Sequence, residues 1–96
     1  MFIHSFAFRW KTPLTESQKQ RAFDEINALH TRIPGILETL VGFNISPRAQ
    51  GYEFGGTMKF ADRAAFKAYN EHPVHQQLLV WLLPLIDPVE VDFEMP

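Results

Sequence analysis

The sequence contains no cysteine, which excludes disulfides, thiolate metal ligands and thiol nucleophiles. It also has no excess of basic residues: the formal net charge is -2, so we expect neither nucleic acid nor an anionic membrane surface as a partner. Long hydrophobic runs are missing too, because Pro84 and Asp87 interrupt the apolar stretch that begins at Leu78. With no signal-peptide pattern or membrane span, the expected location is the cytoplasm.

The apolar content is sufficient for one core. In 96 residues, 46% are hydrophobic and 21% are charged, which is the balance of an ordinary globular domain. We therefore assign residues 1–96 to a single domain without linkers or repeats.

Alternation with a period of two predicts four strands, at residues 2–10, 37–45, 52–60 and 89–94. In the first strand, Phe6, Phe8 and the histidine His4 fall on the face expected to be buried. In the last strand, the apolar residues are expected to face inward and the acidic residues outward.

Helix signals separate these strands. Thr15 and Gln18 form a potential capping box that opens a helix, which Pro34-Gly35 ends after Ile33. Asp62 is a potential cap for a short helix that contains Tyr69. Pro73 suits the first position of a further helix, which stops before Asp87-Pro88.

The resulting order predicts an α+β, ferredoxin-like βαββααβ protomer, with a four-stranded antiparallel sheet and helices on one face. The opposite face is expected to be polar and of mixed sign. Its predicted members are Ser5, Ala7, Arg9, Glu53, Thr57, Lys59, Glu90 and Asp92. Such a face can be solvated, or it can pair with a second copy about a two-fold axis.

The segment from Tyr69 to His75 carries the strongest indication of chemistry. With Pro73 at the first helical position, His72 becomes the cap and His75 the third residue, where the helix dipole favours a neutral imidazole that can act as a base. Tyr69 could donate its hydroxyl to a developing oxyanion. The alternatives are a rim-packing role for Tyr69 and a surface cap for His72.

His4 is a polar residue in an apolar row, so it must either bond to a backbone carbonyl in the core or line a cavity. A metal site made of His4, His72 and His75 is conceivable but not favoured, because capping turns the last two imidazoles in different directions and no carboxylate obviously completes the site. We predict no metal and no cofactor.

Nearly the whole chain resembles the stress-responsive dimeric α/β-barrel (Dabb) family. The resemblance rests on His4 and Phe8 in the opening strand, on the Ile33-Pro34-Gly35 break, and above all on Tyr69-x-x-His72-Pro73-x-His75. Further matches are Val41-Gly42, Asn44 and Met58-Lys59-Phe60-Ala61-Asp62. The resemblance implies a protomer that dimerises through its sheet face to form a central barrel.

Family members include plant stress proteins without a settled activity and olivetolic acid cyclase. By resemblance, the cyclase's catalytic tyrosine and histidine correspond to Tyr69 and His75, and its first-strand histidine corresponds to His4. The expected pocket wall consists of Phe6, Phe23, Ile26, Leu29, Trp81 and Leu82, with His4 and His72 orienting a ligand.

Two hypotheses follow from these residues. The first is a small cyclase or lyase-type enzyme that acts on a carbonyl-containing, polyketide-like or aromatic molecule by His75 and Tyr69 acid–base chemistry. The second is a non-catalytic small-molecule-binding or stress-responsive dimer, because a family resemblance does not fix one activity.

Overall fold

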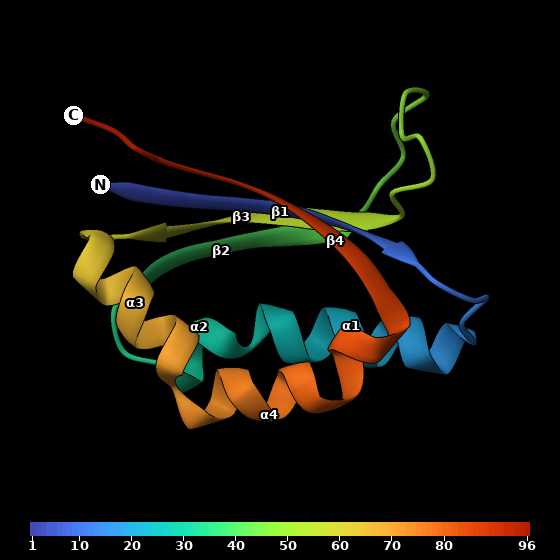
Figure 1. Cartoon of the computed structure of the whole chain (residues 1–96), viewed down its shortest axis with the longest axis horizontal. Coiled ribbons are helices and arrows are strands. Elements are labelled where there is room, and N and C mark those ends of the chain that lie inside the picture. The colour runs from blue at the N-terminus through green and yellow to red at the C-terminus, as the bar shows by residue number, and fades with distance from the viewer.

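One antiparallel sheet with helices packed on one of its faces makes up the molecule, as the computed structural model of residues 1–96 shows (Figure 1). The elements are β1 (Phe2–Trp10), α1 (Glu16–Asn27), α2 (Leu29–Arg32), β2 (Ile36–Phe43), β3 (Phe54–Phe60), α3 (Arg63–Glu71), α4 (Pro73–Leu82), the 3₁₀ turn η1 (Leu83–Leu85) and β4 (Ile86–Glu94). The strand order is β2-β3-β1-β4, with β3 and β1 in the centre. The predicted ferredoxin-like arrangement is confirmed.

The predicted helix starts are present as side-chain caps. The Thr15 hydroxyl accepts the Gln18 N–H at 3.1 Å, while the Gln18 side chain accepts the Thr15 N–H at 2.9 Å. Asp62 accepts the Ala65 N–H at 2.8 Å at the start of α3. These bonds satisfy backbone donors that the first turn of a helix leaves free.

The structure differs from the prediction at several boundaries. The predicted first helix is interrupted at Ala28, so that α1 ends at Asn27 and α2 forms a separate turn. β4 begins earlier than predicted and includes Pro88. A proline is compatible with β4 because this strand lies at the edge of the sheet, where one side of the backbone has no partner strand.

The face assignment of β4 was wrong. Antiparallel pairing sets Asp92 opposite His4 and Glu90 opposite Phe6, so both carboxylates lie on the helix side of the sheet. Consequently Val91, which pairs with Ser5, lies on the outer side. Apolar and acidic residues alternate along β4 as predicted, but the acidic residues face the helices and the apolar residues face outward.

The outer face of the sheet is therefore more apolar than predicted. Its exposed apolar side chains come from both edge strands, with exposed fractions of 56% for Leu40 on β2 and 60% for Val91 on β4. Val89 and Phe93 share this face and are also exposed. The loop between β2 and β3 rises on the same side (Figure 1).

The core lies between the sheet and the helices. Aromatic side chains from β1 and β3 form its floor, and Ala22 and Ile26 of α1 and Leu82 of α4 cover them. Apart from Tyr69 with its hydroxyl, His4 is the one polar side chain among the buried residues. None of the helices is long and apolar enough to cross a membrane.

We expect Gly56→Ala to destabilise the protein by about 1–3 kcal/mol, because added volume in a packed sheet must displace its neighbours. A Cβ at Gly56 would lie 2.3 Å from the Leu40 carbonyl oxygen and 2.6 Å from a Val41 methyl group. Gly42→Ala on the neighbouring strand is the matched control, since nothing lies within 4 Å of its Cβ position. Equal urea midpoints for the two variants would contradict this reading of Gly56.

Candidate functional site

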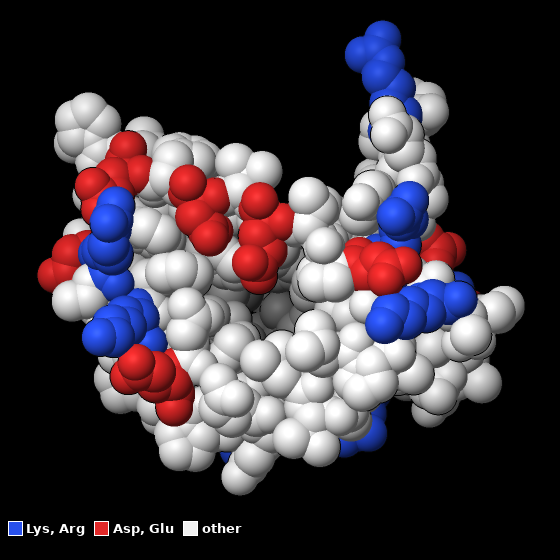
Figure 2. All heavy atoms as spheres, in the orientation of Figure 1, with Lys and Arg blue, Asp and Glu red and all other residues white.

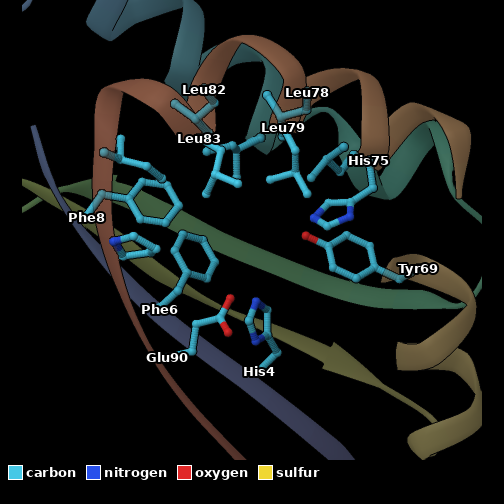
Figure 3. Close-up of a pocket in the computed structure, with 14 residues that line it drawn as sticks. His4, Phe6, Phe8, Tyr69, His75, Leu78, Leu79, Leu82, Leu83 and Glu90 are labelled. Atoms are coloured by element: carbon cyan, nitrogen blue, oxygen red, sulfur yellow. The ribbon is translucent and has the colours of Figure 1, made fainter. Parts of the chain in front are cut away.

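A cavity of about 70 Å³ lies between the sheet and α4, and it is open to the surface beside β4, where its lining residues Pro88 and Glu90 are exposed. This volume is several times the roughly 10–15 Å³ that one water molecule requires. Its polar lining consists of His4, Tyr69, His75 and Glu90 (Figure 3). The remaining lining is apolar: Phe6, Phe8, Ile26, Leu29, Leu78, Leu79, Leu82, Leu83, Ile86 and Pro88.

His4 is held by a carboxylate rather than by the backbone carbonyl that we considered. Its Nδ1 lies 2.5 Å from an oxygen of Asp92 on the adjacent strand. Because a carboxylate accepts hydrogen bonds, Nδ1 carries the hydrogen and Nε2 remains available to a group in the cavity. The pair thus fixes both the tautomer and the orientation of the imidazole.

Tyr69 comes from the last turn of α3 and is 4% exposed. Its ring packs against Phe60 and Phe66, while its hydroxyl points toward the neighbouring His75 ring (Figure 3). Burial, with a smaller contribution from the negative charge of Glu90, raises the pKa of Tyr69 well above its ordinary value. The phenol therefore stays protonated and can act as a hydrogen-bond donor.

His75 lies on the first turn of α4, and its ring centroid is 4.3 Å from that of Tyr69. Its Nδ1 is 3.2 Å from the Asn70 carbonyl oxygen, which can only accept, so Nδ1 carries the hydrogen and Nε2 holds a free lone pair. Burial lowers the pKa of His75, and the neighbouring His4 lowers it further, against an opposing effect of the bond to Asn70. A neutral His75 can accept a proton at Nε2.

Three of the predicted site residues do not line this cavity. His72 caps α4 by accepting the Val74 N–H at Nδ1, at 3.1 Å, in agreement with its predicted alternative role. Phe23 stacks on Phe43 instead. The Trp81 indole N–H donates to Glu25 at 3.3 Å, and the Trp81 ring lies under the Arg21 guanidinium.

Glu90 and Asp92 were missed as site residues because the phase of β4 was predicted incorrectly. Both alternate with exposed apolar residues on an edge strand, and that alternation alone is compatible with either orientation. The signal that could have located Asp92 was the need of a buried His4 for a partner.

The arrangement supports acid–base chemistry on a carbonyl compound. A base at His75 Nε2 and a donor at the Tyr69 hydroxyl face the same apolar space (Figure 3). His, Asp and Glu residues form no group of three or more that could hold a metal ion.

The profile of the stress responsive A/B barrel domain, Dabb, matches residues 3–95. The chain belongs to this family. The sequence matches none of the curated proteins.

Solved structures of similar fold span nearly the whole chain. A Dabb family protein from Mesorhizobium loti is 27% identical, with a TM-score of 0.84 and coverage of 99% of this chain and 96% of that chain. A dimeric ferredoxin-like protein of unknown function from Thermobifida fusca is 26% identical, with a TM-score of 0.85 and coverage of 98% and 90%. Hydroxynitrile lyase from Passiflora edulis, at 18% identity, has a TM-score of 0.80 and coverage of 99% and 95%, which shows a shared fold.

The lowered pKa of His75 predicts a pH-dependent contribution to the stability of this Dabb domain. The unfolded chain takes up the His75 proton near the ordinary pKa of 6.5, whereas the folded chain does so only at lower pH. His75 therefore contributes its full share above pH 6.5 and loses it as the pH falls toward the folded-state pKa.

Compared with His75→Gln, the native protein should lose more unfolding free energy between pH 7.5 and 5.5. Denaturant titrations at the two pH values measure this difference. An NMR titration of the His75 ring should give a midpoint below 6.5, and a midpoint at or above 6.5 would refute the prediction.

Proposed function

We propose that this Dabb protein is a small enzyme of the cyclase or lyase type, acting on a carbonyl-containing aromatic or polyketide-like molecule. The observation that carries the proposal is that a neutral His75 base and a protonated Tyr69 donor lie side by side, with ring centroids 4.3 Å apart, in the lining of one apolar cavity.

The proposed reaction begins when a ligand carbonyl accepts a hydrogen bond from the Tyr69 hydroxyl. His75 Nε2 removes a proton from the carbon next to that carbonyl, and the electron pair of the C–H bond moves onto the carbonyl oxygen as an enolate. In a cyclase, the enolate carbon then bonds to a second carbonyl carbon of the same molecule. The resulting alkoxide recovers the proton from the His75 imidazolium.

His4 is the proposed positioning residue for the ligand. Its ring lies on the sheet side of the cavity, while Tyr69 and His75 come from the helix side (Figure 3). Because Asp92 holds Nδ1, Nε2 is directed by a fixed ring rather than a rotating one. Three polar groups could thereby fix a ligand in an otherwise apolar space.

Deuterium uptake at the methyl group of acetophenone in D₂O tests the proton-abstraction step by NMR, without knowledge of the natural substrate. We expect exchange above the buffer rate, with a decrease of at least about 100-fold in His75→Ala and in Tyr69→Phe. His30→Ala is the control, since His30 is exposed on α2 and lies outside the cavity. Since one structural neighbour is a hydroxynitrile lyase, an aryl cyanohydrin belongs in the same panel.

A non-catalytic binding role is the second candidate. It is favoured by the packing of Tyr69 and His75 into a continuous aromatic cluster with Phe60 and Phe66. If that cluster is their only role, the two variants would lower the melting temperature and no compound in the panel would react. This outcome would exclude the enzyme proposal.

We further propose that the protein forms a homodimer through the outer face of its sheet. Exposed apolar side chains lie along both edges of this face, Val89, Val91 and Phe93 on β4 and Leu40 on β2, and the polar pair Ser5 and Thr57 lies between Val91 and Leu40. Exposed apolar side chains grouped on one face are typical of a surface that a partner covers. The similar protein from Thermobifida fusca is described as dimeric.

A charge on this face should disrupt the proposed dimer. We expect Val91→Glu to shift the mass in sedimentation equilibrium from dimer to monomer, because each carboxylate would have to be buried in the interface without a partner of opposite charge. Val80→Glu is the matched control, since Val80 is 78% exposed on α4. A native protein that sediments as a monomer, or a Val91→Glu variant that remains dimeric, would exclude this interface.

A further inference from the structure

β4 directs a row of carboxylates toward the helix side of the sheet, and all but one have a partner. Asp92 holds His4 at 2.5 Å, and Glu94 accepts from Arg63 at 3.0 Å. Glu90 pairs in register with Phe6 and forms neither an ion pair nor a side-chain hydrogen bond, although it lines the cavity. Glu90 is exposed, so water solvates its carboxylate, and its charge remains available to a ligand in the cavity.

The cavity contains no compensating positive charge. Glu90 is the one charged side chain among the residues that line it, and neither lysine nor arginine is present there. On this face of the molecule, acidic side chains border the central hollow, while basic side chains lie toward the margins (Figure 2). A carboxylate at an apolar mouth attracts cations and repels anions more strongly than one in open solvent.

We propose that Glu90 sets the ligand class of this cavity, which takes a carbonyl compound bearing an amine and disfavours one bearing a carboxylate. This inference rests on the proposed function, because it concerns the ligand of the same site. Glu90 is a specificity-determining residue in this scheme, and the proton transfer remains with His75 and Tyr69.

The cavity dimensions fit such a ligand. A volume of about 70 Å³ accommodates a small group such as an acetyl group, so the rest of a larger molecule would extend into the mouth. Glu90 lies on the β4 side of that space, across from Tyr69 and His75 (Figure 3). A carbonyl at the Tyr69 hydroxyl and an ammonium group at Glu90 would thus occupy opposite ends of one molecule.

A matched set of ligands tests this preference. In 4-(aminomethyl)acetophenone, 4-(hydroxymethyl)acetophenone and 4-acetylbenzoate, the aryl ketone is constant while the substituent is cationic, neutral or anionic. NMR titrations of the protein, followed at the Tyr69 and His75 ring signals, give each Kd. We expect the amine to bind at least about tenfold more tightly than the carboxylate, with the alcohol between them.

Glu90→Gln should reduce the ratio of the two affinities to about one to two, because it removes the charge and nearly preserves the shape. Glu94→Gln is the matched control, since it removes the same charge from the same strand and side of the sheet but outside the cavity, and it should leave the ratio unchanged. The inference is overturned if the ratio survives in Glu90→Gln, if the native protein does not distinguish the ligands, or if none of them binds.

These outcomes are independent of catalysis. A charge preference that depends on Glu90, together with no acetophenone exchange, would exclude the enzyme and retain the inference. Exchange that depends on His75, without a charge preference, would retain the enzyme and exclude the role of Glu90.

Discussion

The register between β1 and β4 is the constraint on which the site depends. It sets His4 opposite Asp92 and Phe6 opposite Glu90, with all four side chains on the helix side of the sheet. Because side chains alternate along a strand, a shift of one residue would turn both carboxylates outward. His4 would then be buried without its partner, and the cavity would lose its only charged group.

The same phase links the cavity to the outer face of the sheet. When Glu90 and Asp92 face inward, Val89, Val91 and Phe93 must face outward. An acidic inner row on an edge strand is tolerable because Asp92 and Glu94 have partners and Glu90 is exposed. The same alternation leaves Val89, Val91 and Phe93 on the outer side, where exposure of apolar area to water is unfavourable. A second copy that covers these side chains would remove that area from water.

Local sequence signals determined most of the fold and part of the site. The alternation of β1, the Thr15–Gln18 capping box and Pro73 at the start of α4 each act over a few residues, and the structure reproduces all three. Which residues of β4 face the helices depends on its pairing with β1, because on an edge strand either the apolar or the acidic residues can face inward. Similarly, Phe23 lies on the same helix as the cavity residue Ile26, and Trp81 on the same helix as Leu82. Which of these side chains face the cavity depends on how each helix is rotated about its axis, which the sequence does not specify.

Burial shifts the pKa values of Tyr69 and His75 in opposite directions, and both shifts favour the neutral side chain. Removing water disfavours the phenolate, so the pKa of Tyr69 rises, and it equally disfavours the imidazolium, so the pKa of His75 falls. Near neutral pH, one group therefore holds a proton to share and the other a lone pair to receive one. The apolar wall around the cavity thus acts on the proposed chemistry directly, because the same leucine and phenylalanine side chains that pack the core keep both groups neutral.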